Sequence, residues 1–120
     1  MKKARLLVVD DEENIRFLFK EELEEEGYSV DVASNGLEAL DKIKQTVFDL
    51  VILDIKMPGM NGIEALNEIK NMNKNLPVIL CSAYGEFKQD FSSWASDGYV
   101  VKSADTKELK QTIKDLLGVV

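Results

Sequence analysis

Residues 50–62 read LVILDIKMPGMNG, in which an apolar run ends at Asp54 and a loop rich in proline and glycine follows. A short apolar run bounded by turn signals predicts a strand buried on both faces, as in a parallel sheet. In open α/β sheets, functional groups gather just beyond the carboxyl ends of the strands. Asp54 is therefore the first candidate for a functional residue, although a helix cap or turn residue is the plainer interpretation.

Similar patterns recur along the chain and predict strands at residues 6–9, 77–81 and 99–101, with a half-buried edge strand at 28–32. Apolar residues at helical spacing predict five helices between and after them. Their stripes are Ile15, Leu18, Phe19 and Leu23; Leu37, Leu40 and Ile43; Ile63, Leu66 and Ile69; Phe87, Phe91, Trp94 and Ala95; and Leu109, Ile113, Leu116 and Leu117. Phe17 falls off the first stripe and is expected at the surface. Alternating strands and helices predict one α/β domain, residues 1–120, with helices on both faces of a parallel sheet.

Composition narrows the classes of function. The formal charge of −7 and the pI near 4.6 argue against nucleic acid or an anionic membrane as a partner. The single cysteine, Cys81, excludes an internal disulfide, is expected as a buried small hydrophobe, and favours a reducing compartment, the cytoplasm. No apolar stretch has the length of a membrane span. The chain has no histidine, which excludes a histidine-ligated metal and a phosphohistidine on this chain.

Polar residues end four of the predicted strands, and parallel strands bring them to one edge of the sheet: Asp10 and Asp11, Asp54, Ser82 and Lys102. Neighbouring carboxylates repel, so at least one should resist ionising unless a cation is present. Hard oxygen donors favour Mg²⁺. A lysine and a hydroxyl suit the oxygens of a phosphoryl group, and an aspartate can accept that group covalently. Taken alone, Asp10 and Asp11 are equally typical of acids that cap the following helix.

Four motifs resemble the receiver domain of response regulators: residues 8–11 (VVDD), 53–62 (LDIKMPGMNG), 81–83 (CSA) and 98–102 (GYVVK). The resemblance covers essentially the whole chain and is strongest to single-domain phosphorelay and NtrC-type receivers. It implies a three-layer flavodoxin-like (CheY-like) fold with five helices and strand order 2-1-3-4-5.

The resemblance also implies the roles of the site residues. Asp54 would be the phosphoacceptor and a ligand of Mg²⁺. Asp11 would bind the metal directly, Asp10 through water and Lys56 through its backbone carbonyl.

Three further roles concern the switch. Lys102 would contact the phosphoryl oxygens, Ser82 would turn its hydroxyl toward them, and Tyr99 would then move inward. The donor would be a phosphohistidine on a histidine kinase or a phosphotransfer protein. The face formed by the fourth helix, fifth strand and last helix would then control an effector protein or domain. Such a chain is a signalling switch that assists only its own phosphorylation and dephosphorylation.

The sequence departs from the family pattern in two places. Ser103 stands where a proline usually follows the lysine, and a cis bond before a non-proline residue costs about 2.5–4 kcal/mol, so we expect a trans Lys102–Ser103 bond. The segment from Ser82 to Lys102 is somewhat shorter than usual, which affects the fourth helix and the choice of partner. Bulky Lys56 and Tyr84 should hinder attack by water on the acyl phosphate and prolong the phosphorylated state.

Three other functions compete with this interpretation. A haloacid-dehalogenase-like phosphohydrolase needs a second acid two residues after its nucleophile, where this chain has Lys56. A flavodoxin-like electron carrier needs a first loop that attracts phosphate, whereas Asp10, Asp11 and their two neighbours repel an anion. A degenerate receiver that binds partners without phosphorylation stays open because of Ser103 and the short segment.

Overall fold

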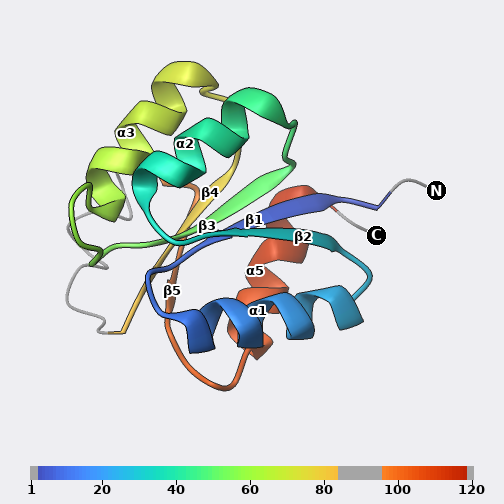
Figure 1. Cartoon of the computed structure of the whole chain (residues 1–120). Coiled ribbons are helices and arrows are strands. Elements are labelled where there is room, and N and C mark those ends of the chain that lie inside the picture. The colour runs from blue at the N-terminus through green and yellow to red at the C-terminus, as the bar shows by residue number, and fades with distance from the viewer. Residues whose placement is uncertain (1–2, 84–95, 119–120) are drawn as a thin grey trace.

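Five parallel strands form the central sheet of the computed structural model, which describes residues 3–83 and 96–118 (Figure 1). The elements in chain order are β1 (Arg5–Val9), α1 (Glu13–Glu25), β2 (Ser29–Ala33), α2 (Gly36–Gln45), β3 (Leu50–Asp54), α3 (Gly62–Met72), β4 (Val78–Ser82), β5 (Gly98–Val101) and α5 (Lys107–Leu117). The strand order β2-β1-β3-β4-β5 confirms the order implied by the resemblance. Because β1 pairs with both β2 and β3, the loops after β1 and β3 meet where the winding direction of the sheet reverses.

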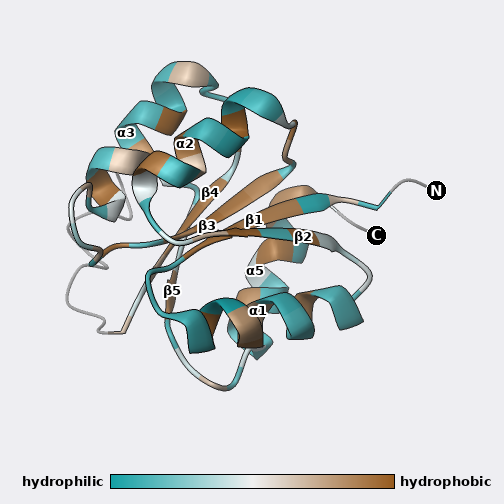
Figure 2. Ribbon diagram, in the orientation of Figure 1, coloured by the Kyte–Doolittle hydropathy of each residue, from teal (hydrophilic) through white to brown (hydrophobic). Residues whose placement is uncertain are grey.

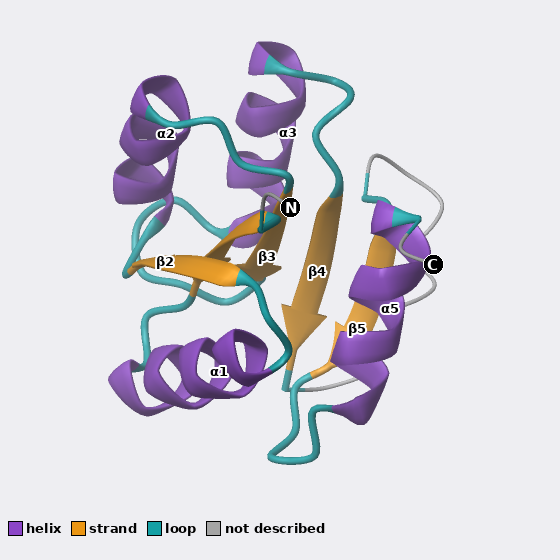
Figure 3. Ribbon diagram, turned by 90° about the vertical axis from the view of Figure 1, so that its right-hand side faces the viewer, coloured by secondary structure: helices purple, strands orange, loops and turns teal. Residues whose placement is uncertain are grey.

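Helices cover both faces of the sheet. In Figures 1 and 3, α2 and α3 lie on one face and α1 and α5 on the other. Alternate strand residues divide between two apolar cores: Leu7, Val51 and Leu80 face α2 and α3, whereas Leu6, Ile52 and Cys81 face α1 and α5. Figure 2 shows the apolar strands between helices whose outer surfaces are hydrophilic. This two-sided burial explains why the strands read as continuous apolar runs.

The four predicted helix stripes that fall within the described residues hold with one error. Leu37 was expected to face the core of α2, but 64% of its surface is exposed, and Ala39 is buried instead. The helix begins at Gly36 after the Asn35 cap, as expected, but its buried face passes through Gly36, Ala39 and Leu40, and helical spacing from these residues turns Leu37 outward. Phe17 is 66% exposed, as expected.

Further expectations concern the fourth helix, the Lys102–Ser103 bond, Cys81 and a membrane span. The fourth helix, with Phe87, Phe91, Trp94 and Ala95, falls outside the described residues, as does Tyr84. No peptide bond is cis within residues 3–83 and 96–118, so the Lys102–Ser103 bond is trans, as expected. Cys81 is buried, and burial raises the pKa of its thiol to about 12. No helix within these two described ranges is long and apolar enough to cross a bilayer.

Polar contacts join the strands β4 and β5 at both ends. At one end, Asp97 Oδ2 accepts bonds from the Val78 N–H (2.8 Å) and from Lys70 Nζ on α3 (2.7 Å), while the Asp97 N–H donates to the Val78 carbonyl. At the other end, the Lys102 N–H donates to the Ser82 carbonyl. The residues that follow β4 and β5 therefore have fixed positions relative to each other.

A second set of polar contacts fixes the loop between β5 and α5. Thr106, which is buried, donates its hydroxyl to Glu22 Oε1 on α1 at 3.0 Å. Lys110 Nζ reaches the same oxygen at 2.9 Å. The start of α5 is thereby attached to α1, and the loop that carries Lys102 spans two anchored elements.

Candidate functional site

The sequence-predicted residues meet at the carboxyl edge of the sheet. They surround a cleft of about 210 Å³ lined by Asp11, Glu12, Asp54, Lys56, Ser82, Ala83 and Lys102. Asp10 lies beneath it, and Asp10, Asp54 and Ser82 are all buried polar residues. Burying such groups is costly unless they are paired, so their partners determine what the cleft can do.

Lys102 supplies the positive charge of this cleft. Its Nζ atom lies 3.0 Å from Asp10 Oδ2 and 3.4 Å from Asp54 Oδ1. Glu12 Oε1 is 3.6 Å away, and the Lys102 side chain is only 8% exposed. An ammonium group is thus held beside two buried carboxylates from different strands.

Burial raises the pKa values of both Asp10 and Asp54, and neighbouring carboxylates add to the effect. Burial is the main cause for Asp54, and the charge of Asp10 adds to it, so the pKa of Asp54 rises to about 7 despite the nearby Lys102. Burial likewise raises the pKa of Asp10, although bonds from the Glu12 N–H and Lys102 oppose the shift. The raised pKa of Asp54 agrees in direction with the expectation that one carboxylate resists ionising without a cation, although burial contributes more to it than repulsion does.

The ammonium of Lys102 responds in the opposite direction. Burial alone would lower its pKa, but the hydrogen bond to Asp10 and the charges of Asp54, Asp10 and Glu12 outweigh burial and raise the pKa above its usual value. Lys102 therefore stays charged, and the cleft keeps a permanent cation next to Asp54.

A glycine that sequence reasoning did not identify holds the loop after Asp54 in place. Gly62 begins α3, and its N–H donates to the Ile55 carbonyl at 2.7 Å. A Cβ atom at Gly62 would lie 2.1 Å from the Asp54 carbonyl oxygen and 2.7 Å from Ile55 Cα. Only glycine permits this approach, so the segment from Asp54 to Gly62 folds back against β3. In the sequence, only the Asn61-Gly62 pair, which is typical of a turn, indicated a special backbone conformation at this position.

The acids of the first loop form a candidate metal site. One carboxylate oxygen from each of Asp10, Asp11 and Glu12 lies within 4.8 Å of the other two. Both oxygens of Asp10 are already engaged, Oδ1 by the Glu12 N–H and Oδ2 by Lys102, whereas Asp11 is exposed. These hard oxygen donors, with Asp54 in the same cleft, fit Mg²⁺. Glu12 was not among the expected ligands. Asp10 has two roles at once: its Oδ1 accepts a bond from the Glu12 N–H at the start of α1, and its Oδ2 faces Lys102 in the site.

Ser82 and Tyr99 lie on neighbouring strands. Tyr99 pairs with Leu80, two residues before Ser82, and strand alternation directs Ser82 and Tyr99 to the same side of the sheet. Tyr99 is 8% exposed and belongs to the core beneath α2 and α3. A displacement of Ser82 would therefore change the packing around Tyr99.

A parallel sheet in the order 2-1-3-4-5, with a buried lysine between two aspartates at its carboxyl edge, defines the receiver class of signalling domains. The family model of the response regulator receiver domain matches residues 6–114, and the chain belongs to that family. It is 39% identical over 119 residues to sporulation initiation phosphotransferase F of Bacillus subtilis, covering 98% of this chain and 96% of that protein.

Solved structures agree with the sequence comparison. The response regulator TrrA of Thermotoga maritima, solved with Mg²⁺ and BeF, is 55% identical and has a TM-score of 0.90, covering 94% of this chain and 98% of TrrA. TrrA has also been solved in complex with the histidine kinase ThkA, with a TM-score of 0.88. Other relatives are longer, and this chain spans 26% of the transcriptional regulatory protein ZraR of Klebsiella oxytoca.

Proposed function

We propose that this chain, over residues 1–120, is a phosphoaccepting receiver domain that takes a phosphoryl group from a phosphohistidine onto Asp54. The observation that carries this proposal is the ammonium of Lys102 at 3.4 Å from Asp54 Oδ1, within a cleft that opens to solvent beside Asp11 and Lys56. The donor is a histidine kinase or a histidine phosphotransfer protein in the cytoplasm, and ThkA in complex with TrrA supports that class of partner.

Asp11 and Asp54 are the proposed direct ligands of Mg²⁺, with Asp10 acting through water and Lys56 through its backbone carbonyl. Asp10 has the geometry for the indirect role, because the Glu12 N–H and Lys102 already occupy its two oxygens. When bound, the cation supplies positive charge that neutralises the carboxylates and the oxygens of the arriving phosphoryl group. TrrA in complex with Mg²⁺ and BeF supports the choice of metal.

The transfer needs little covalent chemistry from the protein. A carboxylate oxygen of Asp54 attacks phosphorus, a new P–O bond forms, and the P–N bond of the phosphohistidine breaks with its electron pair passing to the imidazole. The charged Lys102 then has two roles: it favours the ionised form of Asp54 before transfer, and it neutralises the phosphoryl oxygens afterwards. Ser82, in the lining of the same cleft, donates its hydroxyl to those oxygens.

The signal follows from a change in the contacts of Ser82. Once phosphoryl oxygens attract the Ser82 hydroxyl, the end of β4 shifts, and Tyr99 moves further inward on the same side of the sheet. The face formed by the fourth helix, β5 and α5 then presents a different surface to an effector protein or domain. No second substrate is turned over, since the chain assists only its own phosphorylation and dephosphorylation.

Intact mass tests this function directly. After incubation with acetyl phosphate and Mg²⁺, the wild type should gain one phosphoryl group, and neither Asp54→Ala nor an EDTA-treated sample should do so. An adduct that persists in Asp54→Ala would contradict the assignment of the acceptor. If neither acetyl phosphate nor a phosphorylated histidine kinase produces an adduct, the chain is a degenerate receiver that binds partners without phosphorylation.

A further inference from the structure

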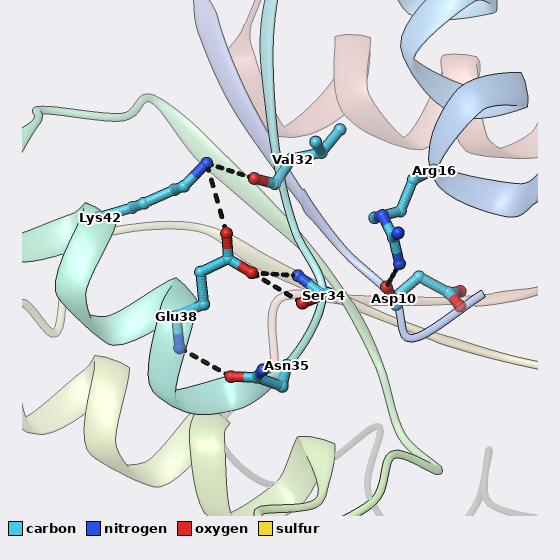
Figure 4. Close-up of polar contacts among 7 residues, drawn as sticks. All are labelled: Asp10, Arg16, Val32, Ser34, Asn35, Glu38 and Lys42. Carbon is cyan, nitrogen blue, oxygen red and sulfur yellow. Dashed lines mark hydrogen bonds and ion pairs between the residues drawn. The ribbon is translucent and has the colours of Figure 1, made fainter. Parts of the chain in front are cut away.

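The backbone of Asp10 is held on both sides by groups outside its own strand. Its N–H donates to the Ala33 carbonyl of β2 at 3.1 Å, and its carbonyl accepts a bond from Arg16 Nη1 at 2.8 Å. Figure 4 shows the guanidinium reaching from α1 down to this carbonyl. The peptide unit that leads into Asp11 is therefore fixed by a charged side chain from the next helix.

Arg16 holds the chain after Asp11 as well. Its own N–H donates to the Glu12 carbonyl at 3.1 Å, which forms the first turn of α1. The helix start has no side-chain cap, because Glu12 occupies the cap position without such a bond. Arg16 therefore donates to the Asp10 carbonyl with its side chain and to the Glu12 carbonyl with its backbone N–H. Asp11, which is exposed, lies between these two bonded carbonyls.

A fixed acid outside the cleft lies near enough to Arg16 to sense its charge. Glu38 on α2 accepts bonds from the N–H and hydroxyl of Ser34 at 2.7 and 2.8 Å. These bonds, together with the charges of Lys42 and Arg16, hold the pKa of Glu38 below its usual value. Figure 4 shows this cluster on the other side of Ser34 from Asp10. The charge of Arg16 therefore also interacts with an anion that does not belong to the cleft.

We propose that Arg16 is a positioning residue of the metal site, which holds the Asp10 carbonyl so that the Asp11 carboxylate is directed at the cation. The proposal rests on the proposed function and deepens it, because it names what preorganises a ligand of the cation. Arg16 does not touch the metal or the phosphoryl group. Its effect passes through the main chain between Asp10 and Glu12.

Positioning and simple electrostatics predict opposite results when Arg16 is neutralised. Removing a positive charge near a divalent cation should strengthen metal binding by Coulomb's law. Removing the group that orients a ligand should weaken binding, and the loss of such outer contacts costs about 10–100-fold in metal affinity. The sign of the change therefore identifies the role.

Lys20 provides a matched control. It lies on the same helix one turn beyond Arg16, and its Nζ also bonds a strand carbonyl, that of Val30, at 2.8 Å. Lys20→Gln removes the same charge and the same kind of bond, together with an exposed ion pair to Glu24, but it does so at Val30 in β2 rather than beside Asp11. The two variants should therefore differ in metal binding while losing similar contacts.

The experiment measures the dissociation constant of Mn²⁺, a probe for the Mg²⁺ site, from the EPR signal of the free ion. We expect Arg16→Gln to bind Mn²⁺ about tenfold more weakly than the wild type, and Lys20→Gln to bind it as the wild type does. In an Asp11→Asn background, Arg16→Gln should have no further effect, because the ligand that Arg16 positions is gone. Urea unfolding at saturating EDTA checks that each variant is folded at the temperature of the titration.

Three outcomes overturn the inference: unchanged or tighter Mn²⁺ binding by Arg16→Gln, an equal loss in Lys20→Gln, or the same loss with and without Asp11. If the wild type takes up one phosphoryl group on Asp54 while any of these holds, only the role of Arg16 is wrong. If the wild type itself binds no Mn²⁺, the proposed metal site and the role of Arg16 fail together.

Discussion

Lys102 Nζ lies 3.4 Å from Asp54 Oδ1, although the strand β4 separates the strands that carry the two residues. The long lysine side chain therefore crosses the end of β4, where Ser82 is located, before it reaches Asp54. Both side chains are almost fully buried, at 8% and 5% exposure. This pair joins the ends of β5 and β3, the contact of Lys102 with Asp10 adds the end of β1, and the strength of these ion pairs should govern both stability and reactivity.

Lys102→Met should destabilise the metal-free protein most at alkaline pH. The substitution leaves Asp10 and Asp54 buried without a counter-charge, which costs about 3 kcal/mol in comparable buried pairs. The loss should be smaller at pH 5 than at pH 8, because protonation relieves the repulsion. Urea unfolding in EDTA at the two pH values measures it. Lys114→Met, which removes an exposed partner of Glu26, should cost less than about 1 kcal/mol. An equal loss at both pH values would contradict the electrostatic cause.

Asp54→Asn should stabilise the metal-free protein at pH 8. The pKa of Asp54 is raised to about 7 in the folded state, so folding favours its protonated form. Wild-type stability should therefore fall as the pH rises from about 4, the unfolded value, to about 7. Asparagine removes this penalty, which amounts to at most about 4 kcal/mol.

Paired urea titrations of wild type and Asp54→Asn test this pH dependence. The gap between them should be large at pH 8, nearly absent at pH 4, and smaller again when Mg²⁺ binds the wild type. Asp41→Asn, an exposed change on α2, should show no such trend. A gap that does not vary with pH would exclude titration of Asp54 as its source.

Gly62→Ala should displace the loop after Asp54 and lower both stability and phosphoryl uptake. A Cβ atom there would lie 2.1 Å from the Asp54 carbonyl, so backbone must move. Gly36→Ala is the matched control, because Gly36 also begins a helix and its Cβ would meet only the flexible Met60 side chain at 3.0 Å or more. Thermal unfolding and intact mass after acetyl phosphate should separate the two variants. Equal behaviour would mean that the close approach at Gly62 is unimportant.

Lys56→Ala should shorten the life of the phosphorylated state. Lys56 lines the cleft beside Asp54, and its long side chain restricts the approach of water to the acyl phosphate. We expect a severalfold faster decay of the phosphorylated mass after the donor is removed, and a further increase when Tyr84 is also replaced by alanine. Lys44→Ala, an exposed change on α2, is the control. A decay rate equal to that of the wild type would refute the blocking role.

Sequence reasoning located the residues at strand ends well, for a physical reason. Asp54 and Lys102 directly follow apolar runs, and a parallel sheet brings such positions to one edge whatever the strand order. Their approach to 3.4 Å needs more than a shared edge, because it also depends on the strand order, which leaves only β4 between β3 and β5. The strand order itself came from the family resemblance.

Contacts between a side chain and a distant main-chain group were not predictable in the same way. Arg16 looks like one more charged residue on a surface helix, and only the packing of α1 against β1 brings its guanidinium to the Asp10 carbonyl. Gly62 looks like a turn residue until the close approach of Asp54 is measured. The prediction for Leu37 was wrong because the small residues Gly36 and Ala39, and not Leu37, share the buried face of α2 with Leu40.

The polar contacts that join β4 and β5 at both ends have an evolutionary consequence. Asp97 secures one end of the strand pair through Val78 and Lys70, while the bond from Lys102 to Ser82 secures the other. The chain therefore leaves the sheet at Ser82 and returns at Asp97 between two independently anchored points. Its length and composition in between can diverge, or be exchanged in the laboratory, without moving Lys102 relative to Asp54. A lineage of such domains can thus inherit one chemistry unchanged while each member acquires its own recipient for the signal.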